Sequence, residues 1–224
     1  MSLGQLPTQT GMSAYYKTEG NSNDSSGNAV NGTDTSITYV RGYFNQGAQF
    51  NGTSSYISLG TGLNLTNEIS IRFWIKHPTG SPSTCTIINK GNRTNAASLQ
   101  YQVGVQTDGT LRMSVSDGIT ITAISSIKTI NDNLWHFVLA KFSGDNNQDT
   151  IQFDIDGKID NTAASTIIAM QSTAKSVAIG RDGDLATRYL TNGCILSEII
   201  IEPRFIFRSE MYKYYTQAKG RFCI

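Results

Sequence analysis

The chain has 224 residues, a formal net charge of +1 and only 16% charged residues. This length suits one domain with a large buried core better than two small domains. The balanced charge argues against a nucleic-acid surface, and no apolar run approaches the roughly eighteen residues of a membrane span, so neither nucleic acid nor membrane insertion is expected.

The N-terminal segment is polar and rich in turn-forming residues. Residues 1–12 are aperiodic and are expected to form a flexible tail, so that a single domain covers 13–224. Ala14–Lys17 is predicted to be a short strand. The run G-N-S-N-D-S-S-G-N at Gly20–Asn28 favours turns, because Asn and Asp bond their own main chain and Gly permits positive φ. Further short strands are predicted over Ile37–Val40, Ala48–Phe50 and Phe50–Leu59.

The most regular strand signal lies in L-T-N-E-I-S-I-R-F-W-I-K, Leu65–Lys76. Apolar and polar residues alternate with a period of two, which is typical of a strand with one buried face. The predicted core face carries Ile69, Ile71, Phe73 and Ile75, and the opposite face carries Ser70, Arg72, Trp74 and Lys76. We therefore expect Trp74 to be half exposed.

Three Asp-Gly pairs predict hairpins in the middle of the chain. They are Asp108-Gly109, Asp117-Gly118 and Asp156-Gly157. Phe153 and Ile155 are predicted core residues, because they alternate with polar neighbours. The strands predicted in this part are Thr86–Asn89, Tyr101–Gln106, Leu111–Val115, Ile119–Ile124, Ile151–Ile155 and Lys158–Asp160.

The last third of the chain supplies the remaining elements. L-W-H-F-V-L-A-K-F at Leu134–Phe142 is apolar on both faces, which predicts a central strand covered on both sides. Late strands are predicted at Val177–Gly180 and Cys194–Glu202. Ser209 can cap a short helix through Ala218, with Tyr212 and Tyr215 on one side. Many short strands separated by turns predict an all-β, two-sheet antiparallel sandwich with one short C-terminal helix.

The cysteines carry no metal or redox motif. Cys85, Cys194 and Cys223 are odd in number, far apart and without a Cys-x-x-Cys pair. We expect free buried thiols.

Several stretches occur in the order of a known family. They are A-Y-Y-K-T-E-G-N-S-N-D-S-S-G-N, G-A-Q-F-N-G-T-S-S-Y-I-S-L, I-S-I-R-F-W-I-K, L-W-H-F-V-L-A-K-F-S-G, F-D-I-D-G-K, V-A-I-G-R and S-E-I-I-I-E-P-R-F-I-F-R-S-E-M. Together they resemble the laminin G-like domains of the concanavalin A-like jelly-roll superfamily. The end of the chain departs from the family pattern in two places. The spacing from Gly193 to Ser197-Glu198 is one residue longer than in the family, and Glu202-Pro203 replaces an aromatic-Asn pair.

The resemblance implies a jelly-roll sandwich of two curved sheets, with ligand sites on the concave face or in the rim loops. Its members are mostly binding or adhesion modules of secreted glycosidases, adhesins and phage particles. We therefore expect a non-enzymatic, lectin-like module for a glycan or another cell-surface ligand, located extracellularly, at the cell surface or on a virion. The alternative is a structural or decoration protein of a phage particle or cell-surface assembly, and a glycosidase is the third possibility.

Catalytic residues are scarce in the sequence. A glycosidase needs two carboxylates about 5–9.5 Å apart. Glu198 and Glu202 would lie roughly 13 Å apart on one strand. Asp154 and Asp156 are two residues apart, which is a permissible spacing, but Asp156 belongs to an Asp-Gly turn. The two histidines, His77 and His136, lie in no recognisable motif, so no catalytic residue is expected.

A calcium site is the first candidate binding site. Asp24, Asn28 and the turn carbonyls offer oxygens of the kind that Ca²⁺ prefers. The resemblance places this loop near the closing strand, which makes Glu198 a candidate third ligand. The alternative is an Asx turn without metal.

Carbohydrate contacts are the second candidate. Trp74 and Tyr101 are possible stacking platforms for sugars, whereas Trp135 is expected in the core. A rim loop concentrates charged side chains that suit sugar hydroxyls, although a solvated, salt-bridged loop is the alternative. The loop residues are Arg181, Asp182, Asp184 and Arg188.

Overall fold

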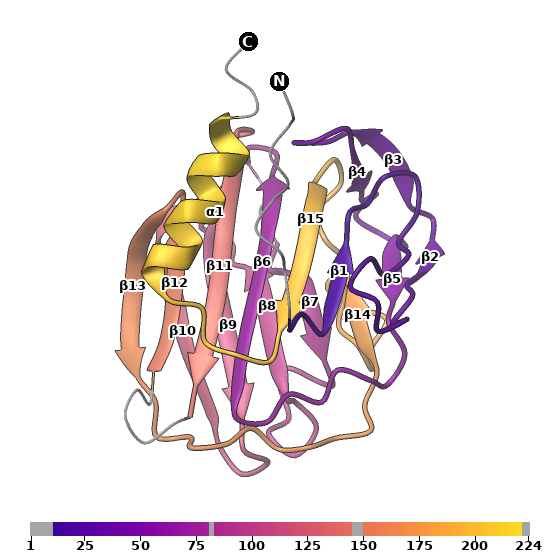
Figure 1. The fold of residues 1–224 in the computed structure, drawn as a ribbon. Coiled ribbons are helices and arrows are strands. Elements are labelled where there is room, and N and C mark those ends of the chain that lie inside the picture. The colour runs from indigo at the N-terminus through magenta and orange to yellow at the C-terminus, as the bar shows by residue number, and fades with distance from the viewer. Residues whose placement is uncertain (1–10, 81–82, 145–149, 221–224) are drawn as a thin grey trace.

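The computed structural model describes residues 11–80, 83–144 and 150–220. These residues form two packed antiparallel sheets and one helix, which confirms the predicted two-sheet jelly-roll sandwich (Figure 1). Most of the expected N-terminal tail lies outside the described residues, as does Cys223. Cys85 and Cys194 are free and buried, as predicted.

The larger sheet has eight strands and is built around β6. This strand pairs with β11 from Lys76 opposite Trp135 to Glu68 opposite Ser143, and β15 lies on its other side. The strand order is β13 (Lys158–Ala164), β12 (Thr150–Ile155), β11 (Trp135–Ser143), β6 (Glu68–Lys76), β15 (Ile195–Glu202), β4 (Gln46–Gln49) and β3 (Thr38–Arg41), with β1 (Ala14–Tyr16) also paired to β15.

The second sheet has seven strands and packs against the first. Two of the Asp-Gly pairs close its hairpins, and the third joins β12 to β13, so all three hairpin predictions are confirmed. At this third turn Asp156 and Gly157 both have positive φ, the backbone that a tight hairpin requires. The strand order is β10 (Ile121–Thr129), β9 (Thr110–Ser116), β8 (Tyr101–Val105), β7 (Cys85–Lys90), β14 (Val177–Ile179), β5 (Tyr56–Ser58) and β2 (Thr33–Thr35).

The main core lies between the two sheets. It contains all four residues of the predicted apolar face of β6, together with Phe153 and Ile155. Val138 and Ala140 of β11 join this core, whereas Phe137 and Leu139 pack on the opposite side of the sheet. The prediction of a central strand covered on both sides is therefore confirmed.

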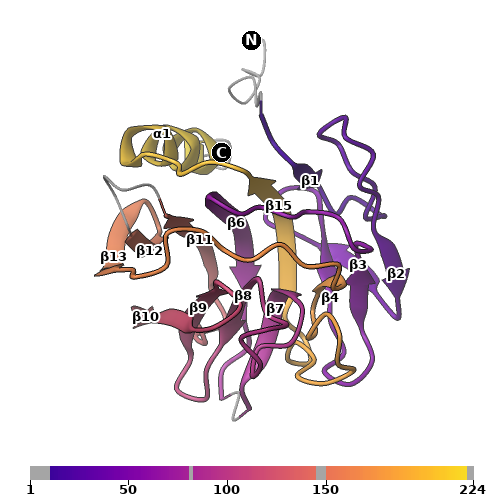
Figure 2. The ribbon, with the colours of Figure 1, turned by 90° about the horizontal axis from the view of Figure 1, so that it is seen from below.

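Helix α1 (Arg208–Gly220) covers the outer face of the eight-stranded sheet. Figure 2 shows the helix on one side of the molecule and strands β7–β10 on the opposite side. Met211, Tyr214 and Ala218, spaced three and four residues apart, are the buried helix residues. Tyr212 is 57% exposed, whereas Tyr215 is partly buried and packs against the residues beneath the helix.

A β-bulge at Glu198 accounts for the extra residue near the end of the chain. Ser197 lies opposite Trp74 and Ile200 lies opposite Arg72, so one more residue is present on β15 than on β6. Glu198 takes the left-handed backbone with φ of 55°. The bulge keeps the rest of β15 in register with β6.

The two sheets are joined at one edge through a carboxylate. Strand β10 is irregular between Ser125 and Thr129, where it leaves its pairing with β9. Asp160 of β13 accepts hydrogen bonds from the main-chain N–H groups of Ile127 and Lys128, at 2.6 and 3.0 Å. These bonds link the outermost strand of the smaller sheet to that of the larger one.

Candidate ligand-binding face

Trp74 lies beneath helix α1, so the expected half-exposed position is wrong. It is 2% exposed, and its ring stacks on Tyr43 with centroids 3.4 Å apart and planes 8° apart. Phe137 and Tyr215 contact the same ring, with centroids at 5.3 and 6.0 Å. A ring enclosed in this way is part of a core and is not a platform for sugars.

Tyr101 is also a core residue and is not a surface platform. Its ring is fully buried between the sheets. Its hydroxyl donates to the carbonyl oxygen of Leu63 at 3.2 Å, which satisfies its polar end. Both aromatic side chains that the sequence suggested for sugar stacking therefore stabilise the fold.

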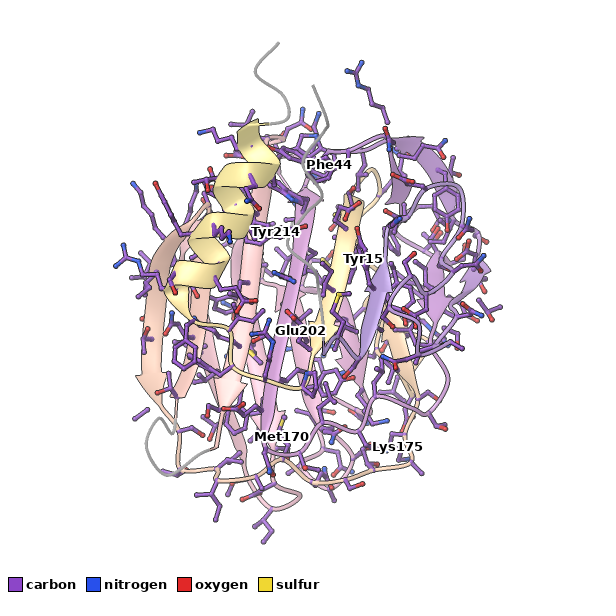
Figure 3. The ribbon with its side chains drawn as sticks, in the orientation of Figure 1. Tyr15, Phe44, Met170, Lys175, Glu202 and Tyr214 are labelled. Carbon is purple, nitrogen blue, oxygen red and sulfur yellow. The ribbon has the colours of Figure 1, made fainter. Side chains whose placement is uncertain are left out.

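The covered face of the eight-stranded sheet holds two buried ion pairs. Arg72 Nη2 lies 3.3 Å from Glu202 Oε2, and Lys141 Nζ lies 2.9 Å from Asp154 Oδ2. Figure 3 labels Glu202 on this face and Tyr214 on the helix that covers it. Arg72 also lies over the Tyr214 ring, 4.5 Å from its centroid, and Lys141 Nζ donates to the Ile206 carbonyl oxygen at 2.9 Å, so the cations of both pairs contact the cover.

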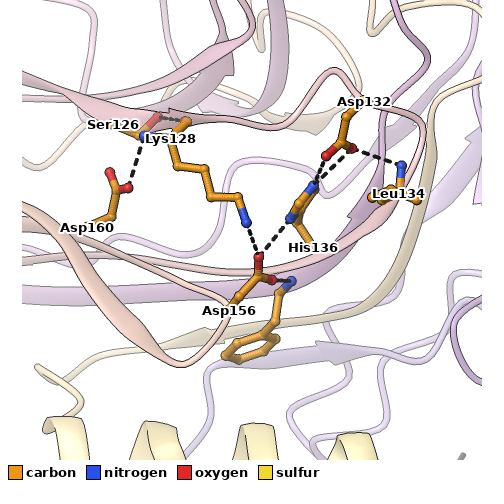
Figure 4. A network of polar contacts seen from close by, with 8 residues as sticks. Ser126, Lys128, Asp132, Leu134, His136, Asp156 and Asp160 are labelled. Carbon is orange, nitrogen blue, oxygen red and sulfur yellow. Dashed lines mark hydrogen bonds and ion pairs between the residues drawn. The ribbon is translucent and has the colours of Figure 1, made fainter.

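His136 is enclosed in a polar network at one edge of the sandwich (Figure 4). Its Nδ1 lies 2.8 Å from Asp156 Oδ2, and its Nε2 lies 3.0 Å from Asp132 Oδ1. Lys128 also bonds Asp156 Oδ2, at 2.6 Å. Burial alone would lower the pKa of His136, but the two carboxylates outweigh it and raise the pKa. Both ring nitrogens of this imidazole thus have partners within the fold.

His77 is likewise engaged within the fold. Its ring nitrogens lie 2.9 Å from the Pro78 carbonyl oxygen and 3.1 Å from Thr191 Oγ1. Burial lowers the pKa of this imidazole. No nucleophile activated by a histidine is found among these contacts.

Asp24 organises the first loop through its carboxylate. Oδ1 accepts from the main-chain N–H groups of Tyr15 and Ser26, and Oδ2 accepts from the Ser26 hydroxyl and the Val30 N–H, at 2.8–3.1 Å. Burial would raise the pKa of Asp24, but these bonds lower it. The carboxylate therefore caps an Asx turn in the way the alternative interpretation predicts.

The other two candidate calcium ligands have separate partners. Glu198 accepts a short hydrogen bond from the hydroxyl of Tyr15. The main-chain N–H of the same tyrosine donates to Asp24, so the two carboxylates contact opposite ends of Tyr15. Asn28 Nδ2 donates to the carbonyl oxygens of Met12 and Ser13. Within residues 11–80, 83–144 and 150–220, no group of three or more His, Cys, Asp or Glu side chains is arranged to hold a metal ion.

The rim loop after β14 folds over the outer face of the seven-stranded sheet. Thr86 Oγ1 donates to Asp182 Oδ1 at 2.7 Å, and the Gly183 N–H donates to Asn89 Oδ1 at 2.8 Å. Burial raises the pKa of Asp182, although Thr86 and nearby arginines oppose the shift. Asp184 pairs with Lys175 at 2.9 Å. Asp182 thus fastens the loop to the sheet through Thr86 of β7, and Asp184 ties the loop to the segment that precedes β14.

Polar side chains cover this outer face next to the loop. Leu111 and Met113 of β9 point into the core, so Arg112 and Ser114 point outward. Arg112 lies in one row with Gly104 and Thr86 of the neighbouring strands. Ser114 and its partner Gln102 face away from the core and are nevertheless nearly buried.

Three arginines meet over these strands, and we call Arg93, Arg112 and Arg188 the arginine cluster. Arg188 Nε lies 3.6 Å from Asp182 Oδ2 and the Arg188 side chain is 36% exposed. Burial lowers the pKa of Arg93, and the charges of Arg188 and Arg112 lower it further while Asp182 opposes them. Arg188 is the member of the cluster that pairs with a carboxylate, and the charges of Arg112 and Arg188 both act on Arg93.

A further arginine lies on the same face. The Arg181 guanidinium covers the ring of Tyr56 at 3.7 Å from its centroid. Tyr56 faces outward because its neighbour Ile57 is in the core. The predicted loop residues Arg181 and Arg188 thus belong to the outer face of the seven-stranded sheet, although they contact different partners.

The sequence did not identify Arg93, Arg112 or Tyr56. Arg112 and Tyr56 each alternate with core residues, and this alternation was the available signal for an outward position. Nothing in the sequence placed these strands beside the rim loop, because the neighbouring segments lie far apart along the chain.

Comparisons with known proteins support the fold. The sequence model described as the concanavalin A-like lectin/glucanases superfamily matches residues 51–196. No curated protein matches the sequence. In the described residues, no helix is both long enough and apolar enough to cross a membrane.

Similar solved structures include clostridial toxin domains. The binding domain of Paraclostridial Mosquitocidal Protein 1 has a TM-score of 0.70 at 17% identity, over 86% of this chain and 48% of that one. A botulinum neurotoxin type C structure, whose title describes interaction with two ganglioside molecules, has a TM-score of 0.70 at 12% identity over 93% and 51%. The binding domain of botulinum neurotoxin DC in complex with rat synaptotagmin II has a TM-score of 0.70 at 12% identity over 93% and 52%. This chain spans about half the length of each, and the likeness shows the fold alone.

Proposed function

This chain belongs to the concanavalin A-like lectin/glucanases superfamily, and from that premise we propose that it is a non-enzymatic, lectin-like recognition module. Its ligand is a carbohydrate bound on the outer face of the seven-stranded sheet and its rim loop. The observation that carries the proposal is the contrast between the two outer faces. Helix α1 covers the outer face of the eight-stranded sheet. Among the described residues, the outer face of the seven-stranded sheet has no such helix and presents half-buried basic side chains over polar strands.

The similar structures support a cell-surface ligand. Botulinum neurotoxin type C interacts with two ganglioside molecules for cell entry, and the binding domain of botulinum neurotoxin DC binds rat synaptotagmin II. We accordingly propose that the protein acts outside the cell, at a cell surface or on a virion.

The arrangement of carboxylates favours binding over hydrolysis. Asp154 is paired with Lys141, Glu202 with Arg72, and Glu198 with the Tyr15 hydroxyl. Glycosidases need two carboxylates free to act on either side of a bond. Asp154→Asn and Glu198→Gln should therefore change no hydrolytic activity. Turnover of a β-glucan by the pure protein, abolished by either substitution, would contradict the proposal.

A glycan array at high protein concentration, with calcium and with chelator, tests the proposal. Ser125 lies opposite Arg112 and faces outward, so Ser125→Trp should block the face and reduce binding to any positive glycan. Thr38→Trp, at an exposed position of the other sheet, is the matched control and should bind normally. Binding unaffected by Ser125→Trp would place the site elsewhere. An array without positive glycans would favour the structural or decoration role.

A further inference from the structure

His136 lies between two carboxylates that come from different parts of the chain (Figure 4). Asp132 belongs to the loop that leads into β11, and Asp156 belongs to the turn between β12 and β13. Nδ1 of the ring lies 2.8 Å from Asp156 Oδ2, and Nε2 lies 3.0 and 3.1 Å from the two oxygens of Asp132. The nearly buried imidazole therefore joins the loop to the turn.

This arrangement requires a hydrogen-bond donor at both ring nitrogens. An ionised carboxylate only accepts hydrogen bonds, and an imidazole carries two N–H groups only when it is protonated. A neutral imidazole has one N–H, so one of the two carboxylates would then face the lone pair of a ring nitrogen. The contacts of His136 thus fit the protonated ring, and loss of the proton must break one of the two bonds.

The charged groups around the ring favour its protonated form. Besides the two carboxylates, Lys128 of β10 reaches this corner, with its Nζ 2.6 Å from Asp156 Oδ2. Burial would raise the pKa of Asp132 and of Asp156, but their hydrogen bonds, including those from His136, lower it. Both carboxylates are therefore ionised in the range where the imidazole titrates.

The two carboxylates are held unequally once the ring is neutral. Asp156 keeps the main-chain N–H of Phe137 at 3.0 Å and the ammonium of Lys128, and its side chain is 24% exposed. Asp132 keeps the N–H of Leu134 at 2.9 Å, and its side chain is 44% exposed. Since water replaces a lost partner more easily at the more exposed carboxylate, the bond to Asp132 is the one that breaks.

We propose that His136 is a pH-sensitive latch, whose protonated ring fastens the turn at residues 132–134 to the corner of the sandwich and whose neutral ring releases it. Asp132 caps this turn, and Leu134, which is 62% exposed, ends it. The N–H of Asn133 still donates to the His77 carbonyl oxygen at 3.0 Å, so the release loosens the turn and leaves the sandwich closed. Because the pKa of His136 is raised, the latch is closed below that raised value and opens above it. It would act whatever ligand the module binds.

Amide hydrogen exchange, followed by NMR on the full chain across a pH series, tests the latch. Exchange rates corrected for base catalysis report the protection of the Leu134 N–H, and the ring resonances of His136 report its protonation in the same samples. We expect the protection of Leu134 to fall roughly tenfold or more as the ring loses its proton. The N–H of Phe137, which donates to Asp156, is the internal control and should keep its protection.

Two substitutions separate the latch from general effects of pH. In Asp132→Asn the side-chain oxygen can accept from Leu134 while the amide donates to the unprotonated Nε2, so Leu134 should stay protected at high pH. His136→Gln cannot take up a proton, so the protection of Leu134 should no longer depend on pH. The matched control is Asp108→Asn, in a turn where Asp108 accepts from the Thr110 N–H at 2.9 Å, and it should behave as the wild type. Far-UV circular dichroism and the melting temperature verify the folding of each variant.

Three results would overturn the latch. An equal pH dependence of Leu134 protection in the wild type, Asp132→Asn and His136→Gln would show that the imidazole does not hold the turn. Loss of protection at Phe137 in place of Leu134 would show that Asp156 is the carboxylate released. A ring that is neutral at about pH 6, below the usual pKa of histidine, while Leu134 remains protected would show that the closed turn does not need the proton.

Discussion

Replacing Trp74 distinguishes a core tryptophan from a surface sugar platform. Trp→Ala in a core costs about 3–5 kcal/mol, and the lost stack on Tyr43 adds about 0.5–1.5 kcal/mol. The indole Nε1 is buried without an acceptor among the described residues, so its removal returns about 1–3 kcal/mol. Trp74→Ala should therefore lower the free energy of unfolding by about 3 kcal/mol, the result of the central values of these three effects.

Trp74→Phe provides the matched comparison. It keeps an aromatic ring on Tyr43 and removes the unpaired N–H, so it should cost less than about 1.5 kcal/mol. Urea denaturation followed by far-UV circular dichroism is the suitable assay, since Trp74 is one of only two tryptophans and fluorescence would change with the substitution itself. A loss under about 1 kcal/mol for Trp74→Ala, together with lost glycan binding, would refute the reasoning.

Three further predictions concern stability. Phe73→Ala should lower the free energy of unfolding by about 3–5 kcal/mol in urea melts, because the ring is fully buried between the sheets; a cost under about 1 kcal/mol would contradict this packing. Asp24→Ala should cost about 1–3 kcal/mol even in chelator, since four donors lose their acceptor; an unchanged melting temperature in chelator would contradict this, and wild-type melts in calcium and in chelator test whether an ion adds to stability. The stability that His136 gains between Asp132 and Asp156 should be complete below its unfolded pKa of about 6.5 and should be lost as pH rises through its raised folded pKa. Urea melts across this range should show a weaker pH dependence for His136→Gln, and an identical dependence would contradict the assignment.

Local patterns predicted the strands because they act over a few residues. Alternation in β6 identified the residues that face the core, and the Asp-Gly pairs located the three hairpins. The extra residue before Ser197-Glu198 became a β-bulge at Glu198, which is how a strand absorbs an insertion without losing register.

The residues whose positions the sequence did not predict correctly are those whose surroundings come from distant segments of the chain. Alternation shows that the two faces of β6 differ, but it does not show what covers the polar face. Trp74 and Arg72 are buried because a helix more than 130 residues later packs over them. Arg93 and Arg112 were missed for the same reason, since they and the predicted Arg188 come from three separate segments of the chain.

The bond between Asp160 and β10 has a consequence for self-association. An outermost strand offers unpaired N–H groups that a second chain can extend into a longer sheet. Here a carboxylate of the same chain occupies two of them, beside Ile127 and Ile159, which are 72% and 47% exposed. Loss of Asp160 would leave open amides next to exposed isoleucines. The sandwich could then fold normally and still begin edge-to-edge polymerisation at this corner.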